Sequence, residues 1–301
     1  MKAAAFSYTR PRHLSEVLSL LVKHGDEARL LAGGQTLLAT LNMRLSEPSL
    51  LIDLSAVKEL KGLSLQGNSL RIGALVTHTE IETSPLVAQH APLLSTAAPH
   101  IAHRAIRNLG TFGGSIAYGD PAAEWPACLL ALTGVVVVRG PKGERRIAAD
   151  DFFTGLYTTE LAPDEVIVAC EVPSAQADDK FAFSELARRH GDYAVVGLAA
   201  SARLHNGSIE HIRLAWLGVG STPMRSSNTE RVLHGQALDQ HTISKAIEVL
   251  RGELEPLADL THSEAAKKQL ASVLLKRALQ SWVQAASSIA ADLASLPPSH
   301  L

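Results

Sequence analysis

The sequence predicts an α+β protein in which two α/β units precede a three-stranded antiparallel sheet and a helical C-terminal quarter. Three observations indicate this class. Helical and strand patterns alternate through the first 55 residues, strand patterns dominate residues 135–173, and three long strand patterns over 181–218 precede purely helical periodicity. The sequence contains no repeat of solenoid length, so these units are expected to be distinct.

The first unit covers about residues 1–56. Leu14, Val17, Leu18 and Leu21 recur at helical spacing, and Gly25 follows them, which is typical of an amphipathic helix with a C-terminal glycine. The rest of the unit is expected to be a strand, a glycine pair, a helix opened by Thr36, and a buried strand. The predicted ranges are Ala28–Leu31 and Leu50–Leu54 for the strands and 37–41 for the helix, which must end before Pro48.

The second unit covers residues 57–175. Two apolar runs around Gln66-Gly67-Asn68 predict a hairpin, and Thr77-His78-Thr79-Glu80 has the capping-box form that begins a helix. A helical stretch is expected over Pro92–Ala102. Asp120 as N-cap and Pro121 as first residue predict another helix, which ends at Leu132. Strands are expected at Val135–Arg139, Arg145–Ala148 and Val166–Val172.

The polar segment 174–179 has no periodicity, so it is expected to separate a domain of residues 1–175 from a second domain of residues 180–290. The second domain is predicted to begin with an antiparallel sheet whose last two strands are joined at Asn206-Gly207. Its strands are Phe181–Ala187, Ala194–Arg203 and Ile209–Gly218, and its helices include Ile243–Leu250 and Glu264–Ala286.

Composition and charge exclude several classes of function. The net charge of −2 over 301 residues, without a basic stripe, gives no electrostatic footprint for nucleic acid. The N-terminal stretch lacks the apolar core of a signal peptide, and the longest nearly apolar run, Cys128–Val138, is too short to cross a bilayer. We therefore expect a cytoplasmic protein without a membrane segment.

Metal binding is not expected in this chain. The two cysteines, Cys128 and Cys170, lie in apolar stretches that are typical of buried positions, and two thiols cannot hold an iron–sulfur cluster. His100 and His103 have the spacing of a ligand pair, but no carboxylate or thiol beside them completes a ligand set.

Two segments of the same build carry the chemical signal of the sequence: Ala32-Gly33-Gly34-Gln35-Thr36 and Thr111-Phe112-Gly113-Gly114-Ser115. Small successive residues can turn their backbone N–H groups to one side and bind an anion, helped by the positive end of a following helix. Two such loops suffice to hold one pyrophosphate. The alternative is that each glycine pair only makes a tight turn, and spacing alone leaves both open. Neither the dinucleotide-binding glycine motif nor the P-loop motif occurs.

Five longer strings extend this observation over most of the chain: AGGQTLLATLNMRL (32–45) with LLIDLS (50–55), IRNLGTFGGSIAYGDPAAEWPACLLAL (106–132), DFFTGLYTTELAPDEVIVACEVP (151–173), ARRHGDYAVVGLAA (187–200) and GVGSTPMR (218–225). In order and spacing they resemble the FAD-binding medium subunit of molybdenum hydroxylases. That family includes the flavoprotein subunits of aerobic carbon monoxide dehydrogenase and of bacterial xanthine dehydrogenase-type enzymes.

The resemblance implies a two-part FAD-binding domain of the PCMH type over residues 1–175 and a C-terminal flavoprotein domain over 180–290. It implies that Glu124 holds ribityl or ribose hydroxyls, that Leu161 lies against the flavin ring and that Tyr193 stands over it, with a core leucine and a packed tyrosine as the alternatives. Asp120 either contacts the cofactor or serves only as an N-cap. The residues implied at the pyrophosphate are Ala32, Gly33, Gly34, Gln35, Thr36, Thr111, Gly113, Gly114 and Ser115.

The chain also departs from the family pattern. Phe112 and Ser115 stand where isoleucine and asparagine are common, and Glu185 stands near a position where lysine is common, which reverses a charge near the flavin. A bulky side chain in place of Gly33 or Gly113 is expected to abolish flavin retention and to leave the fold largely intact.

The function implied by the resemblance is electron transfer. A large subunit with the molybdenum cofactor oxidises an organic substrate, a small [2Fe–2S] subunit relays electrons, and non-covalent FAD in this chain passes them to NAD⁺, oxygen or another acceptor. The expected assembly is a dimer of heterotrimers. No catalytic acid or base is expected, and His78, His100 and His190 are expected at the surface.

Two alternatives stay open from the sequence. The first is a stand-alone FAD-dependent oxidoreductase of the same FAD-binding class, such as a peptidoglycan-precursor reductase or a small-alcohol oxidase, which needs an acid or base near the flavin ring. The second is a scaffold subunit that has lost the flavin. Neither the substrate of the complex nor the terminal electron acceptor follows from this sequence.

Overall fold

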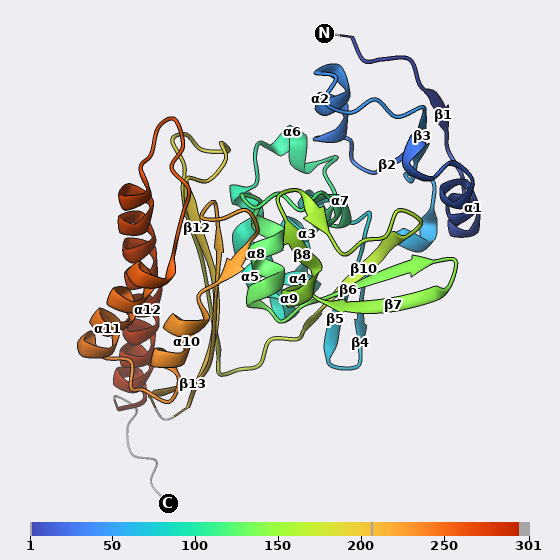
Figure 1. Ribbon diagram of the computed structural model, residues 1–301. Helices are drawn as coiled ribbons and strands as arrows, with labels where there is room; N and C mark the ends of the chain where they lie inside the picture. The colour runs from blue at the N-terminus through green and yellow to red at the C-terminus, as the bar shows by residue number, and fades with distance from the viewer. Residues whose placement is uncertain (1, 206, 295–301) are drawn as a thin grey trace, which may run out of the picture.

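The computed structural model describes residues 2–205 and 207–294, with side chains described as far as residue 283. It is an α+β fold, as predicted, with three main sheets whose strand orders are β1-β3-β2, β4-β5-β10-β6-β7 and β11-β12-β13-β14. In Figure 1 the N-terminal unit lies at one end, the five-stranded sheet with its helices in the middle, and the C-terminal sheet and helices at the other end. None of the helices in the described part of the chain is long and apolar enough to cross a membrane.

The N-terminal unit is a small parallel sheet in which β3 pairs with both β1 and β2. Helix α1 turns Val17 and Leu21 into its core, as the helical spacing predicts. The predicted strand Ala28–Leu31 is confirmed, whereas β1 was not predicted because its three residues carry no clear alternation. The elements are β1 Ser7–Thr9, α1 Leu14–His24, β2 Ala28–Leu31, α2 Leu37–Asn42 and β3 Leu50–Asp53, with a 3₁₀ turn at Gly25–Glu27.

The middle unit is a five-stranded antiparallel sheet covered by short helices. Its central strand β10 pairs with β5 on one side and with β6 on the other. The strands are β4 Leu63–Gln66, β5 Ser69–Gly73, β6 Val135–Gly140, β7 Gly143–Ala148 and β10 Val166–Pro173, with a separate hairpin of β8 Phe153–Gly155 and β9 Thr158–Thr159. The helices are α3 His78–Thr83, α4 Pro85–His90, α5 Pro92–Ala97, α6 Arg104–Arg107, α7 Phe112–Tyr118, α8 Glu124–Ala131 and α9 Ala149–Phe152, with 3₁₀ turns at Lys58–Leu60 and Ala98–His100.

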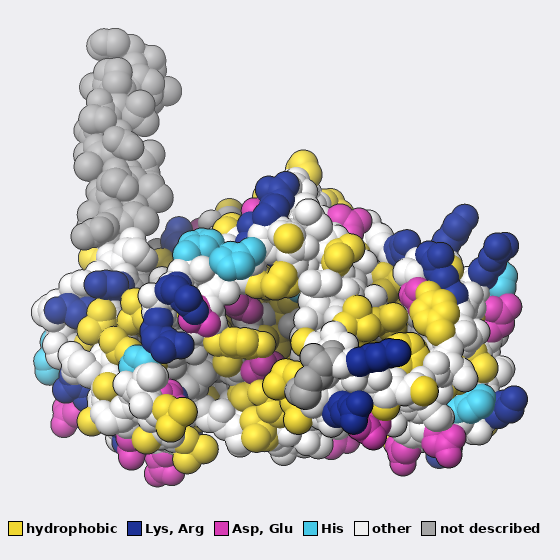
Figure 2. Space-filling view, turned by 90° about the horizontal axis from the view of Figure 1, so that it is seen from above, with side chains coloured by type: hydrophobic (Ala, Val, Ile, Leu, Met, Phe, Trp, Pro, Cys, Tyr) yellow, Lys and Arg dark blue, Asp and Glu magenta, His cyan; other side chains and the backbone are white. Residues whose placement is uncertain are grey.

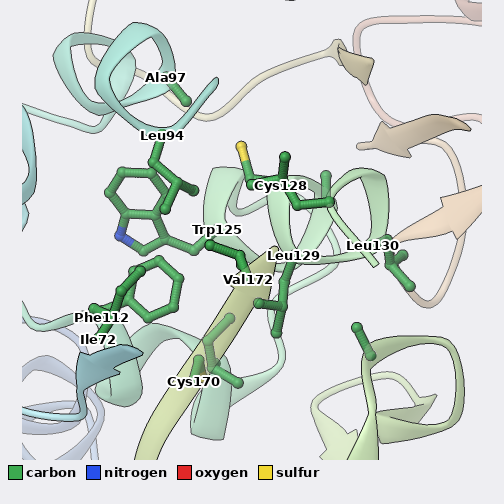
Figure 3. Close-up of a cluster of buried hydrophobic side chains, with 14 of the residues drawn as sticks. Ile72, Leu94, Ala97, Phe112, Trp125, Cys128, Leu129, Leu130, Cys170 and Val172 are labelled. Carbon is green, nitrogen blue, oxygen red and sulfur yellow. The ribbon is translucent and has the colours of Figure 1, made fainter. Parts of the chain in front are cut away.

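Helix α8 is the centre of the largest hydrophobic core. Figure 3 shows Trp125 between Phe112 of α7 and Leu94 of α5, and the rings of Trp125 and Phe112 lie 5.2 Å apart. Both cysteines are fully buried in this core, Cys128 on α8 and Cys170 on β10, as expected from their apolar stretches. The core therefore fixes the segment that carries the second glycine pair.

Two predicted helices of this unit differ from the structure. The stretch Pro92–Ala102 is helical only to Ala97 and then continues as a 3₁₀ turn that contains Pro99, whose missing N–H favours such a break. The helix predicted from Pro121 begins at Glu124, with Ala123 as its N-cap. Asp120 as N-cap was wrong, because its carboxylate accepts a hydrogen bond from the N–H of Ala122 at 2.9 Å and shapes a turn before the helix.

The C-terminal unit has four antiparallel strands, one more than predicted, because the two-residue strand β14 is added at the edge of β13. Asn206 of the predicted turn lies outside the described residues, and Gly207 has a φ of +79°. Helices α10 to α12 lie together on one side of this sheet (Figure 1). The elements are β11 Asp179–Leu186, β12 Val196–His205, β13 Ser208–Leu217, β14 Met224–Arg225, α10 Ser227–Leu233, α11 Gln240–Glu253 and α12 Glu264–Ala294.

Candidate cofactor site

The fold places the two glycine segments side by side. A Cβ added to Gly33 would lie 2.0 Å from the carbonyl oxygen of Leu109, and one added to Gly114 would lie 3.6 Å from the Cβ of Ala32. Only a residue without a side chain permits this approach at position 33. The segment 32–36 between β2 and α2 and the segment 109–115 at the start of α7 therefore form one continuous surface.

The first segment presents free backbone donors. Within the described residues, the N–H groups of Gly33, Gly34, Gln35 and Thr36 make no hydrogen bond. Gly34 has a φ of +71°, so a left-handed residue lies inside this run, which is the arrangement of backbone nests that bind anions. The side chain of Gln35 is held by the carbonyl oxygen of Gly33 at 3.0 Å. This segment has the donors that a phosphate needs.

The second segment differs from the first, contrary to the expectation that both have the same build. Its glycine pair lies in the first turn of α7, and the Thr111 hydroxyl caps this helix by accepting the N–H of Gly114 at 3.2 Å. The N–H of Gly113 donates to the carbonyl oxygen of Ala74 at 2.9 Å. In the described residues the hydroxyl of Ser115 has no partner, so it offers a side-chain donor beside the first segment.

We expected that a bulky side chain in place of Gly33 or Gly113 would leave the fold largely intact, and this expectation was wrong. A Cβ on Gly113 would lie 2.5 Å from the Cβ of Ala74 and 2.8 Å from its carbonyl oxygen, and the neighbour of Gly33 is also backbone. Both glycines are thus required for packing between segments, in addition to any role toward a ligand.

Two acidic residues follow α7 without a cation beside them in the described residues. Asp120 is 7% exposed, and burial raises the pKa of its carboxyl. Glu124, at the first position of α8, accepts a hydrogen bond from its own backbone N–H and is not paired with a cation among the described residues. Burial, and next the negative charge of Glu185, raise the pKa of Glu124 to about 8, so it is largely a neutral carboxylic acid at pH 7. A neutral acid can donate as well as accept a hydrogen bond.

Three of the four tyrosines of the chain gather near Asp120. The rings of Tyr118 and Tyr157 lie 5.0 Å apart. Tyr193 is 66% exposed, and partial burial of its hydroxyl and then the charge of Asp120 raise its pKa to about 12. This exposure rules out a tyrosine packed in the core and leaves a ring free to contact a ligand.

Tyr118 and Tyr157 were missed at the level of sequence. Tyr157 has a φ of +53°, which is strained for a tyrosine, and it precedes β9 in the hairpin that contacts Gly119 through Thr159. Leu161 follows the same hairpin, is partly buried and packs against the main core. The signal available in the sequence was the place of Tyr118, directly between the second glycine pair and Asp120.

Figure 2 shows the face of the molecule that is uppermost in Figure 1, the side on which α2 and α6 lie. Hydrophobic side chains gather across the middle of this face, with acidic side chains among them. Several large apolar side chains near the site are exposed, namely Leu38, Leu109, Leu156, Tyr157 and Tyr193. Donors for an anion and apolar surface for a planar group are therefore both available here.

His78 is buried, so the expectation that it lies at the surface was wrong. It is 6% exposed, and its Nδ1 accepts the indole N–H of Trp125 at 2.9 Å. It lies beneath the second segment, because its backbone N–H donates to the carbonyl oxygen of Gly110 at 3.0 Å. Burial, and then the charge of Arg107, lower the pKa of His78 to about 4, so the ring is neutral at pH 7. By contrast, His190 is exposed and His100 is partly exposed.

This neutral histidine predicts a pH-dependent stability. The unfolded chain protonates His78 near pH 6.5 and the folded chain only near pH 4, so the unfolded state binds more protons between these values and stability falls as the pH decreases. The full loss is about 3 kcal/mol, reached below pH 4. Denaturant unfolding of the wild type and of His78→Gln between pH 4 and 7 measures this, since glutamine cannot titrate and its amide oxygen can accept the indole N–H. Equal pH slopes in both proteins would contradict the assignment.

No group of three or more histidine, cysteine, aspartate or glutamate side chains suited to a metal ion occurs among the described residues. The fold and the site thus define a class of protein: one with free backbone donors suited to an anion, next to exposed aromatic and apolar side chains suited to a planar group. Comparison with known proteins identifies the family within this class.

Residues 4–175 match the family described as the FAD binding domain in molybdopterin dehydrogenase, and residues 181–282 match the CO dehydrogenase flavoprotein C-terminal domain. The chain is 38% identical over 279 residues to the nicotine 6-hydroxylase medium subunit of Paenarthrobacter nicotinovorans, covering 93% of this chain and 98% of that one. It is 36% identical over 282 residues to the carbon monoxide dehydrogenase medium chain of Hydrogenophaga pseudoflava, again covering 93% and 98%.

Solved structures agree. A carbon monoxide dehydrogenase structure from Hydrogenophaga pseudoflava matches with a TM-score of 0.91 at 37% identity over 93% of this chain and 98% of that one. Quinoline 2-oxidoreductase from Pseudomonas putida 86 matches with a TM-score of 0.89 at 37% identity over 95% and 99%. The chain belongs to the FAD-binding medium subunits of molybdenum hydroxylases, a family of oxidoreductase subunits.

Proposed function

We propose that this chain binds one FAD non-covalently, accepts electrons from a [2Fe–2S] subunit and passes them from the flavin to an external acceptor. A large subunit with the molybdenum cofactor would oxidise the organic substrate, and the complete assembly would be a dimer of heterotrimers in the cytoplasm. Residues 1–175 would form the FAD-binding domain and residues 180–290 the C-terminal flavoprotein domain. FAD supplies two-electron and one-electron redox chemistry when bound, and the protein binds and orients it.

One observation carries the proposal: four successive free N–H groups, at residues 33–36, lie in a backbone nest against the second glycine segment. Such donors fit the charge of a pyrophosphate, and the residues present fit the cofactor. We assign the phosphate end to the residues Ala32, Gly33, Gly34, Gln35, Thr36, Thr111, Gly113, Gly114 and Ser115. The backbone N–H groups of Gly113, Gly114 and Ser115 already donate within the protein, so the free donor that these three residues offer is the hydroxyl of Ser115.

The remaining site residues are assigned to the hydroxyls and the ring. Glu124 and Asp120 would bind ribityl or ribose hydroxyls, and a neutral Glu124 suits this role because hydroxyls both donate and accept. Leu161 and Tyr193 would contact the isoalloxazine ring, and the exposure of Tyr193 supports this placement.

The two alternatives make different predictions about partners. A tagged chain expressed with its neighbouring genes should retain two further polypeptides, one carrying molybdenum and one carrying iron and acid-labile sulfide. Adding the organic substrate without oxygen should then bleach the flavin absorbance. A chain that purifies alone with a reducible flavin would favour the stand-alone oxidoreductase, and one that retains both partners without any flavin would favour the scaffold.

A further inference from the structure

The segment 187–195 joins β11 to β12 and carries Tyr193, the exposed tyrosine that we assign to the flavin ring. The backbone N–H of Val195 donates to the carbonyl oxygen of Leu186 at 2.8 Å, and this hydrogen bond closes the base of the segment. The two ends of the segment are therefore fixed to the C-terminal sheet. The position of Tyr193 between them depends on what the rest of the segment touches in the middle unit.

Gly191 is the residue at which this segment lies against the middle unit. It has a φ of +79°, and a Cβ added to it would lie 2.7 Å from the Cε1 of His103 and 2.8 Å from the carbonyl oxygen of Ala102. The carbonyl oxygen belongs to the backbone and cannot rotate away, and the left-handed φ is itself unfavourable for a residue with a side chain. Only glycine therefore permits this contact, two residues before Tyr193.

The turn that receives Gly191 is held from inside the middle unit. Ala102 has a φ of +42°, which is uncommon for a residue with a side chain. The buried guanidinium of Arg107 holds it there, because its Nη1 donates to the carbonyl oxygens of Ile101 at 3.0 Å and of Ala102 at 3.3 Å. The Nε of Arg107 donates to Glu82 at 2.9 Å, so an ion pair fixes the guanidinium in turn. A strained residue kept by such a network gives the contact a defined position.

A second glycine contact holds the other end of the segment. Gly218 has a φ of +77°, and a Cβ added to it would lie 2.8 Å from the carbonyl oxygen of Val195. The N–H of Gly218 donates to the carbonyl oxygen of Pro121 at 2.9 Å, in the turn before α8. Tyr193 thus lies between two close contacts, that of Gly191 on one side and that of Gly218 on the other.

We propose that Gly191 and His103 are positioning residues that hold Tyr193 against the flavin ring. This inference rests on the proposed function, which gives Tyr193 its contact with the ring. A side chain that is 66% exposed has few packing contacts of its own to fix its place. The position of Tyr193 is then set by its backbone, and the backbone is held by the contact between Gly191 and His103.

Limited proteolysis of the flavin-free full chain tests this contact without the cofactor. Trypsin cleaves after exposed basic residues, and Arg188 and Arg189 are exposed in the segment, as is Lys142 in the turn between β6 and β7. In Gly191→Ala, cleavage at 188 and 189 should be about fivefold to a hundredfold faster, as expected when overpacking opens a segment locally. Cleavage after Lys142 should keep its wild-type rate, which separates local opening from general unfolding.

The matched control is Gly207→Ala, since Gly207 has the same φ of +79° but an added Cβ there meets nothing within 4 Å. This control carries the backbone strain without the contact, so cleavage at 188 and 189 should keep the wild-type rate. Equal acceleration in Gly191→Ala and Gly207→Ala, or none in Gly191→Ala, would overturn the proposal.

Flavin fluorescence tests the consequence for Tyr193. A tyrosine ring in contact with a flavin quenches its fluorescence, so Tyr193→Leu should increase the fluorescence per bound FAD. His103→Ala removes the ring beside Gly191 and should raise this fluorescence toward the level of Tyr193→Leu, with no further gain in the double variant. A merely structural role of His103 would lower the FAD content or the stability but leave the fluorescence of the remaining bound FAD unchanged, and that result would overturn the proposal.

The two readouts separate this inference from the proposed function. If the segment opens in Gly191→Ala but the wild type takes up no FAD, the proposed function fails and the role toward the ring fails with it, whereas the contact at Gly191 stands. If the wild type binds FAD and neither Gly191→Ala nor His103→Ala changes cleavage or fluorescence, the proposed function stands and this inference is overturned.

Discussion

Replacing Gly33 by alanine should reduce FAD retention by about tenfold to a hundredfold, since overpacking typically costs about 1–3 kcal/mol. The added methyl would lie 2.0 Å from the Leu109 carbonyl oxygen and 2.8 Å from the Cα of Gly110. These neighbours are backbone atoms, which cannot rotate away as a flexible side chain can. The segment 32–36 must therefore separate from the start of α7. This separation would move the free backbone N–H groups of residues 33–36 away from the second glycine segment, and the two segments could then no longer bind one pyrophosphate together.

The matched control is Gly252→Ala, because a Cβ there meets nothing within 4 Å. Gly252 lies inside α11, so alanine should stabilise the helix by up to about 1 kcal/mol and leave the flavin content unchanged. Flavin per chain after gel filtration and the circular dichroism spectrum should be measured together for both variants. Full flavin retention in a folded Gly33→Ala protein would contradict the role given to the contact between the two segments.

Replacing Trp125 by alanine should lower the free energy of unfolding by about 3–5 kcal/mol, the usual cost of removing a large buried aromatic side chain. Trp125 is fully buried and contacts Phe112 with ring centroids 5.2 Å apart. Its removal also leaves the Nδ1 of His78 without its donor. Because His78 and Phe112 both support the second glycine segment, flavin retention should decrease along with stability.

Trp125→Phe separates the two contributions. Phenylalanine keeps most of the apolar ring but removes the indole N–H, so the expected loss is about 1–3 kcal/mol, from one unsatisfied buried acceptor. Urea unfolding of the three proteins at pH 7 measures the difference. An alanine variant within 1 kcal/mol of the wild type, by the scale of core substitutions, would show that α8 does not hold this core.

The sequence correctly predicted those elements whose stabilising contacts join residues close together in the chain. The capping box at Thr77 and Glu80 is present with both of its hydrogen bonds, because all of its partners lie within four residues. The helical spacing of Val17 and Leu21, which turns both residues into the core, likewise depends on near neighbours. The short strand β14 was missed, since two residues next to β13 carry no period of their own.

The residues that were wrongly predicted depend on distant partners. His78 is buried because Trp125, 47 positions later, donates to its ring, and no local pattern in the sequence indicates that contact. Gly33 and Gly113 resemble loop glycines in sequence, but their packing against Leu109 and Ala74 is set by tertiary structure. Asp120 had the sequence context of an N-cap, yet its carboxylate bonds two residues ahead, and the helix begins after that turn.

Some features of the candidate site were predicted from the sequence, and others became visible only in the structure. The resemblance to the medium subunits named both glycine segments, Glu124 and Tyr193 before any geometry was known. The two glycine segments differ in their backbone N–H groups, which are free in the first segment and hydrogen-bonded in the second. Only the three-dimensional structure shows this difference. The raised pKa of Glu124 likewise follows from its burial and, next, from the charge of Glu185, a residue more than 60 positions away in the chain.

The central claim is that this chain by itself binds FAD through these segments. The most direct measurement is the absorption spectrum of the purified full chain, followed by acid release and chromatographic identification of the chromophore. The account predicts non-covalent FAD at about one per chain, because one nest binds one pyrophosphate. A colourless protein that takes up no FAD when the cofactor is added would contradict it, and the glycine segments would then serve only to pack the fold.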